Sequence, residues 1–153
     1  MNSAANNSYP PVAFHFKLQI LGSEDPADYG FQEISGIKVT LDTEAVAEGG
    51  ENRFQHQLPT KTSYAPLVLK RGMALKKSKL TVWCDSAMYY SIDKPIKTYD
   101  VLVSLLNEKR QPVLSWKFVN AYPTAWEASN FNAEDSSILF ETITLSYNYY
   151  VMV

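Results

Sequence analysis

The sequence has a single cysteine, Cys84, so it can form no internal disulfide and no metal site built from several cysteines. Its two histidines, His15 and His56, lie far apart, and neither HExxH nor Cys-x-x-Cys spacing occurs. The Walker loop, the GxGxxG pattern and the Gly-x-Ser-x-Gly nucleophile motif are absent as well. These absences predict a protein that is not an enzyme and that has no catalytic residues, no cofactor and no metal.

Long apolar runs are also missing. No stretch approaches the ~20 apolar residues of a membrane-spanning helix. The first residues lack the basic and apolar regions of a secretory signal, so we expect synthesis in the cytoplasm without a signal peptide. The formal net charge is only −2, which gives no bulk attraction to nucleic acid or to anionic membranes. We therefore expect no membrane-spanning segment and no sequence-specific nucleic-acid binding.

Strand-like alternation dominates what is present. Residues 1–11 are polar and end in two prolines, which predicts a flexible N-terminal arm before one domain at 12–153. Apolar and polar residues alternate from Phe14 to Ile20, and again from Phe31 to Thr43 with an interruption at Ser35-Gly36. After that glycine, Ile37, Val39 and Leu41 share one face. The pattern predicts two half-buried strands.

The only Gly-Gly pair, Gly49-Gly50, lies between Glu48 and Glu51. A phosphate-binding loop would need a helix after it, but Phe54, His56 and Leu58 alternate with polar residues and predict a strand. We therefore expect a long hairpin-like arm from about Ile37 to Leu58 with the glycines near its tip. A connection is expected over Pro59–Pro66, followed by a short apolar strand at Leu67–Gly72.

One helix is expected between about Met73 and Ser91. Its apolar stripe at helical spacing consists of Leu80, Trp83, Cys84, Ala87 and Ser91. On that stripe Cys84 is interpreted as a small core residue rather than a nucleophile. A single amphipathic helix among many strands is expected to pack over a sheet face or barrel edge.

The C-terminal half is strand-like almost throughout. We expect strands at Lys97–Leu106 and Val113–Asn120 around a turn at 107–110, then an irregular segment at 121–132. The last run, Ser137–Val153, is too long for a straight strand: about fifteen residues span roughly 50 Å, against a domain diameter of about 40 Å. We expect a bend, or a bulge at Phe140-Glu141. One face of this run is hydroxyl-rich and suits a wetted inner surface: Thr142, Thr144, Ser146 and Asn148.

Two charged features allow alternative interpretations. Glu141 lies within an apolar strand, where it is either a general base or, more commonly, a buried carboxylate satisfied by an arginine or by backbone N–H groups. A basic cluster is either a patch for an anion or an acidic partner or an ordinary solvated surface; its members are Lys70, Arg71, Lys76, Lys77 and Lys79.

An ordered set of motifs over about residues 12–150 resembles the tail tube proteins of contractile phages and of phage-tail-like contractile injection systems. The first half contributes Phe31–Ile37, Glu48–Asn52, Leu58-Pro59 and Leu67–Gly72. The second half contributes Trp83, Val101–Glu108, Trp116, Asn120–Pro123, Trp126, and Glu141-Thr142 leading to Leu145–Tyr147.

This resemblance implies a mainly β protomer, an antiparallel sandwich or barrel with one flanking helix. Six protomers would form a ring whose sheets join into a continuous β-barrel, and the rings would stack into the rigid inner tube. The partners implied are further copies of the chain, a sheath protein, baseplate or tube-initiator and tube-terminator proteins, and effector cargo in the lumen. The implied location is an injection particle or virion assembled from a bacterial cytoplasmic product and found outside the cell or in the target.

Within that picture we expect the arm to stack rings and the hydroxyl-rich face to line the lumen. The candidate stacking residues are Glu48, Gly49, Gly50, Glu51, Asn52 and Arg53. The alternative function is that of a secreted ring of the type VI secretion kind, which carries effectors as a chaperone. A small ligand-binding β-barrel is a third, more distant alternative.

Overall fold

Nine strands and one helix make up the described part of the computed structural model, which covers residues 14–24, 27–50, 52–73, 78–130, 134 and 139–153. The N-terminal arm expected at 1–11 lies outside the described residues. The elements are β1 (His15–Ile20), β2 (Asp28–Ser35), β3 (Val39–Val46), β4 (His56–Tyr64), β5 (Leu67–Gly72), α1 (Lys79–Met88), β6 (Tyr99–Leu106), β7 (Pro112–Ala128), β8 (Phe140–Ser146) and β9 (Tyr149–Met152).

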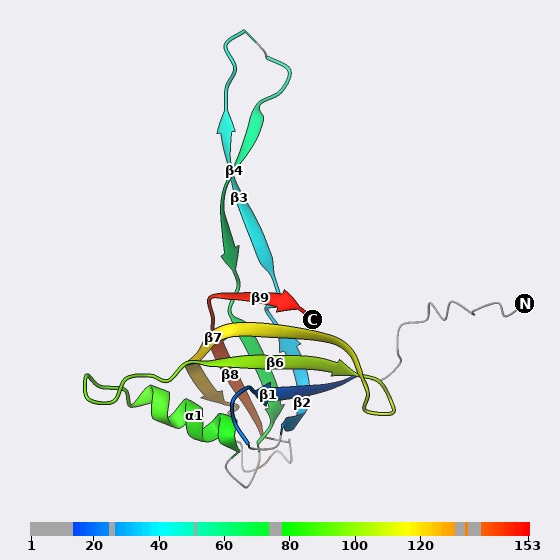
Figure 1. Ribbon diagram of the computed structural model, residues 1–153, viewed down its shortest axis with the longest axis vertical. Helices are drawn as coiled ribbons and strands as arrows, with labels where there is room; N and C mark the ends of the chain where they lie inside the picture. Colours follow the sequence, from blue (N-terminus) through cyan, green and yellow to red (C-terminus); the bar gives the residue numbers. More distant parts are fainter. Residues whose placement is uncertain (1–13, 25–26, 51, 74–77, 131–133, 135–138) are drawn as a thin grey trace, which may run out of the picture.

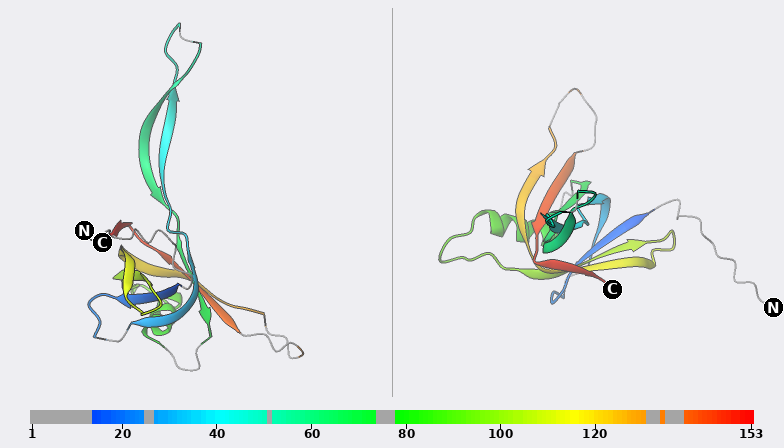
Figure 2. Two further views of the ribbon diagram at one scale, coloured as in Figure 1. Left: turned by 90° about the vertical axis from the view of Figure 1, so that its right-hand side faces the viewer. Right: turned by 90° about the horizontal axis from the view of Figure 1, so that it is seen from above.

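Six of these strands close into an antiparallel barrel. The sheet runs in the order β6-β1-β2-β5-β8-β7, and a further pairing of β6 with β7 closes it. Strand β9 is added along β7, and β3 and β4 form a separate two-stranded sheet. Figures 1 and 2 show the result, a barrel body flanked by α1, with the β3–β4 hairpin standing out from it as an arm. The expected barrel-like protomer with one flanking helix is confirmed.

Side chains fill the barrel, so its interior is a core and not a ligand cavity. Alternate residues along β1, β5, β6 and β8 point inward and are almost fully buried, as period-two alternation requires, and Phe31 of β2 and Phe118 of β7 join them. The most deeply buried include Leu67, Leu69, Val101, Val103, Phe118, Ile143 and Leu145. This packing argues against a small ligand-binding barrel.

The helix covers one side of the barrel with the predicted stripe. Leu80, Trp83, Cys84 and Ala87 are buried. The helix is shorter than expected, because Ser78 caps its N-terminus by accepting a hydrogen bond from the Thr81 N–H, and Tyr89 leaves helical geometry. Ser91 therefore lies beyond the helix and is exposed. No helix among the described residues is long and apolar enough to cross a membrane.

Three strand predictions are wrong. The segment expected to connect at Pro59–Pro66 is mostly strand β4, because proline is tolerated on an edge strand. The segment expected to be irregular at 121–132 continues β7 through Pro123 to Ala128. No bulge lies at Phe140-Glu141, since Gly72↔Phe140 and Arg71↔Glu141 pair in register. The chain bends after β8 instead, where Asn148 donates its N–H to the Val119 carbonyl and β9 begins.

Candidate assembly surface

The arm is a long antiparallel hairpin whose side chains have almost no cover. Strand β3 pairs with β4 from Val39↔Tyr64 to Val46↔His56. Within these two strands, which are described in full, every residue except Asp42 and Tyr64 is exposed. In the described part of the chain neither strand pairs with any other strand, so both outer edges offer unpaired backbone groups. A two-stranded hairpin of this kind is marginally stable on its own in water.

A bulge divides the arm into a root half and a tip half. Leu41 pairs with Thr62 but Thr43 pairs with Pro59, so Thr60 and Lys61 together oppose Asp42. The Thr60 hydroxyl donates to the Asp42 carbonyl at 3.0 Å. The extra residue shifts the alternation of β4, so that Tyr64 and Thr62 lie on the same face as Pro59 and Gln57.

The two faces of the arm differ in charge and in where they carry large apolar side chains. One face is uncharged and contains Val39 and Leu41 near the root, with Thr43, Ala45 and their partners beyond. It continues into the core, because Ile37 packs against the core cluster and Tyr64 contacts Tyr147 and Tyr150. We call this the core-side face. The opposite face holds the charged residues of the two strands, Asp42, Glu44, His56 and Lys61, and near the tip also Val46 and Leu58.

The tip lies where the sequence predicted it. Gly49 and Gly50 form the turn, and Gly50 has a φ of 91°, a left-handed conformation that favours glycine. Beside the turn, His56 Nε2 lies 3.3 Å from Glu48 Oε1, and the Phe54 ring packs edge-on to His56 with centroids 5.2 Å apart. Asn52 and Arg53 follow in the exposed loop, while Glu51 lies outside the described residues. That this tip stacks rings stays a prediction.

The root of the arm is held firmly. Gly36 has a φ of 84°, and a Cβ there would overlap the carbonyl oxygen of Pro66. The backbone segments at Gly36 and Pro66 therefore approach too closely for any residue other than glycine. The Tyr147 hydroxyl donates to the Ala65 carbonyl at 2.6 Å. Burial, together with Tyr150 and Tyr64, raises the pKa of Tyr147 to about 12. The arm is therefore fixed where it leaves the barrel.

The hydroxyl-rich residues of β8 point away from the barrel interior. Ile143 and Leu145 alternate with them and are buried in the core. Thr142, Thr144 and Ser146 are half-buried on the other side of the sheet, beside Lys70 and Val68 of β5. Asn148 lies beyond the end of β8 and is exposed. Their role in lining a lumen stays a prediction.

Glu141 is the buried carboxylate that its position suggested, and its partner is an arginine. Arg71 Nε donates to Glu141 Oε1 at 2.5 Å, and Nη1 donates to Asp28 Oδ1 at 3.0 Å. The arginine side chain is 5% exposed and those of Glu141 and Asp28 are 4% and 13% exposed. Trp126 Nε1 donates to the other Glu141 oxygen at 2.9 Å. A carboxylate engaged on both oxygens in this way is not placed to act as a general base.

The same arginine ties the helix to the barrel. Its Nη2 donates to the hydroxyl of Ser78, the residue that caps α1, at 2.8 Å and to the hydroxyl of Thr81 in the first turn of α1 at 2.9 Å. The predicted basic cluster is thereby divided. Arg71 is buried, Lys70 lies 5.1 Å from the centroid of the Phe140 ring, and Lys76 and Lys77 lie outside the described residues. Sequence reasoning missed Asp28, which nothing in its local pattern distinguishes from a turn residue.

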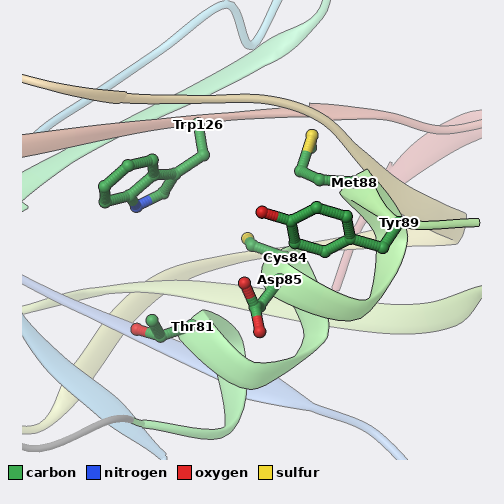
Figure 3. A pocket seen from close by; sticks show the side chains of 6 residues that line it. All are labelled: Thr81, Cys84, Asp85, Met88, Tyr89 and Trp126. Carbon is green, nitrogen blue, oxygen red and sulfur yellow. The ribbon is translucent and has the colours of Figure 1, made fainter.

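An open pocket of about 260 Å³ lies between α1 and β7, beside Cys84. Figure 3 shows Trp126 on one side and Thr81, Cys84, Asp85, Met88 and Tyr89 of the helix on the other. Burial, reinforced by the Glu141 charge, raises the pKa of Cys84 to about 12. The thiol therefore stays protonated near neutral pH, and the cysteine is a core residue as expected.

Comparison with known proteins gives one family. The sequence matches the family described as T4-like virus tail tube protein gp19 over residues 12–151. No curated protein sequence matches the chain.

Among solved structures, a chain of the 6-fold symmetrised baseplate of the anti-feeding prophage is 29% identical, with a TM-score of 0.78 and 95% of this chain and 97% of that one covered. A chain of the sheath–tube complex of an extracellular contractile injection system, PVC, in the extended state is 22% identical, with a TM-score of 0.78 and coverages of 100% and 99%. Hcp1 from Flavobacterium johnsoniae is 18% identical, with a TM-score of 0.56 and coverages of 90% and 94%. The last two show a shared fold.

Proposed function

Because the chain belongs to the T4-like virus tail tube protein gp19 family, we propose that it is the structural subunit of the inner tube of a contractile injection system. In this proposal 12–153 is one tail-tube domain that assembles as stacked hexameric rings around a hollow conduit, and sheath contraction drives the tube into its target. The observation that carries the proposal is the exposed arm. An isolated two-stranded hairpin is only marginally stable in water, so we expect another copy of the chain to cover it.

The subunit has no enzymatic role in this proposal. A structural function agrees with the family, with the Glu141 carboxylate held by Arg71 and Trp126, and with the high pKa of Cys84. Its partners would be the sheath, baseplate and terminator proteins, as the structures of related tubes in such complexes suggest. Effector cargo would occupy the lumen, and the particle would act outside the producing cell.

Between a tube subunit and a secreted ring of the type VI kind, the sequence identities and TM-scores favour the tube subunit. The likeness to the anti-feeding prophage chain is greater than the likeness to Hcp1 in both identity and TM-score. A tube subunit would form long stacks, whereas a carrier ring would be released as discrete hexamers. Negative-stain imaging of the purified protein distinguishes the two, and finding only discrete rings would contradict the tube.

The arm tip, residues 48–53, is proposed as the ring-stacking element. Deletion of Ala47 to Asn52 should leave the barrel folded, because its described residues, 47–50 and 52, are exposed, but should yield rings or monomers instead of stacks. Tube length in electron micrographs measures the effect. Unchanged tube length would disprove the stacking role.

The hydroxyl-rich face of β8 is proposed to line the lumen. A Thr144→Cys variant of the assembled tube should react with a small maleimide and resist a maleimide carried on a bulky polymer, which cannot enter the conduit. The native Cys84 is buried and contributes little background. Equal reaction with the bulky reagent would place Thr144 on the outside of the tube.

A further inference from the structure

The large apolar side chains of the arm form two separate patches on opposite faces. Near the root, Val39 and Leu41 lie on the core-side face; we call these two residues the root patch. Near the tip, Val46, Leu58 and Phe54 lie on the opposite face, Val46 and Leu58 through their strand pairing and Phe54 through its contact with His56; these three form the tip patch. The apolar surface therefore changes sides between Leu41 and Val46, at the level of the bulge.

Both patches are well exposed in the isolated chain. Val39 and Leu41 are 48% and 55% exposed, and Leu58 and Phe54 are 52% and 54% exposed. An amphipathic hairpin that lay on one surface would carry its apolar side chains on one face only. Here a single partner surface can cover only one of the two patches.

The two patches also lie at different distances from the body. The root patch is next to the barrel, where Val39 pairs with Tyr64, which in turn packs on Tyr147 and Tyr150. The tip patch is at the far end of the arm, which stands clear of the body in Figure 1 and in the left view of Figure 2. A neighbour beside the body reaches the root patch, and a neighbour beyond the body along the arm reaches the tip patch.

We propose that two other copies of this chain hold each arm from opposite faces. The root patch is buried against the adjacent copy of the same ring, and the tip patch is buried against a copy of the next ring. This inference rests on the proposed tube function, and it assigns ring closure and ring stacking to different halves of one hairpin. Copies of the chain are the occupants because a related chain occurs in a sixfold assembly and because the arm's unpaired edges need partners that are strands themselves.

The bulge places Leu58 in the tip patch. Without the extra residue on β4, Leu58 would fall on the core-side face together with Leu41. The bulge therefore adds Leu58 to the face on which Val46 already lies through its position on β3, and so collects the apolar side chains of the tip on one side. The charged residues Asp42, Glu44 and Lys61 share the face of the tip patch, and the core-side face is uncharged.

Two single variants test the inference. Each is matched with a control variant at the preceding residue, whose side chain lies on the opposite face of the arm. Leu41→Asp is matched with Thr40→Asp at the root, and Leu58→Asp is matched with Gln57→Asp at the tip. The full-length proteins are compared by size-exclusion chromatography and negative-stain imaging. We expect Leu41→Asp to remain monomeric, Leu58→Asp to form rings that do not stack, and the two controls to form tubes like the parent.

The outcomes separate this inference from the proposed function. If the parent itself forms neither rings nor stacks, the proposed function fails. If the parent forms tubes but each variant behaves like its matched control, or if Leu58→Asp prevents rings while Leu41→Asp permits them, the assignment of the two patches is wrong. Thermal unfolding of each isolated variant checks that it folds; where one does not, Val39→Asp replaces Leu41→Asp, and Val46→Asp with Ala45→Asp replaces the tip pair.

Discussion

The barrel body and the arm are built from the same kind of strand but are stabilised in different ways. In the body, alternate side chains such as Leu145 are fully buried, and even the charged Arg71 and Glu141 are removed from water. In the arm, the same alternation leaves Leu41 and Leu58 about half exposed on opposite faces. The interior of the body is therefore packed within one chain, whereas the arm leaves its apolar contacts to be made on assembly.

This difference has a physical consequence for mutations. Substitutions in the body should change the free energy of unfolding of the isolated chain. Substitutions in the arm should leave that free energy almost unchanged and should change the assembly instead. The predictions that follow test this division, from the largest expected effect to the smallest.

Arg71→Met should have the largest effect on stability. It leaves the buried Glu141 and the partly buried Asp28 without their cation, and removing one partner of a buried ion pair costs about 3–5 kcal/mol. Urea unfolding of the isolated protein measures the loss. The arm control Lys61→Met should change the free energy of unfolding by no more than about 0.5 kcal/mol. Adding Glu141→Leu to Arg71→Met should restore part of the loss; equal losses for Arg71→Met and Lys61→Met would contradict the comparison.

A matched pair of leucines gives the next largest difference. Leu145→Ala in the barrel should lower the free energy of unfolding by about 2–5 kcal/mol, because it leaves a cavity in the core. Leu58→Ala in the arm should lower it by about 0.5 kcal/mol or less in the isolated chain, yet it should shorten the tubes. Thermal unfolding and electron microscopy provide the two measurements. Similar destabilisation by both variants would show that the arm is packed in the free chain.

The junction between body and arm should be intermediate. Gly36→Ala imposes a left-handed backbone on an alanine and forces its Cβ against Pro66, so we expect a loss of at least about 1–3 kcal/mol. Gly49→Ala at the tip meets no atom within 4 Å and does not have a positive φ, so it should change the free energy of unfolding by no more than about 0.5 kcal/mol. Chemical unfolding compares the two glycines. A tolerated Gly36→Ala would mean that the root of the arm is not fixed.

The last prediction concerns pH and is confined to the body. Cys84 has its pKa raised from 9.0 to about 12, so the stability linked to its neutral thiol is fully present below about pH 9. That stability is lost as the pH rises toward 12, because the unfolded chain ionises first. A Cys84→Ala variant should therefore lose less stability than the parent between pH 9 and pH 11 in urea unfolding. Tyr147 titrates in the same direction in both proteins and serves as the common background.

Sequence periodicity was sufficient for the parts of the fold that depend on neighbours along the chain. The alternation of Thr142 and Thr144 with Ile143 and Leu145, and the helical spacing of Leu80, Trp83, Cys84 and Ala87, identified the faces that the structure buries. The Gly49-Gly50 pair located the tip of the arm, because glycines permit the turn that a hairpin needs. These signals involve residues close together along the chain, so they can be read from a single sequence.

Contacts between distant segments were the part that the tertiary structure decided. Nothing near Asp28 in the sequence indicates that it shares Arg71 with Glu141, since these residues lie on three different strands. Likewise the bulge of β4 exists only as a mismatch in its pairing with β3, so the sequence of either strand alone does not reveal it. The sequence by itself determined most of the strands, the helix and the family. Pairing across the sheet decided which face each side chain joins, because register is a property of two strands and not of one.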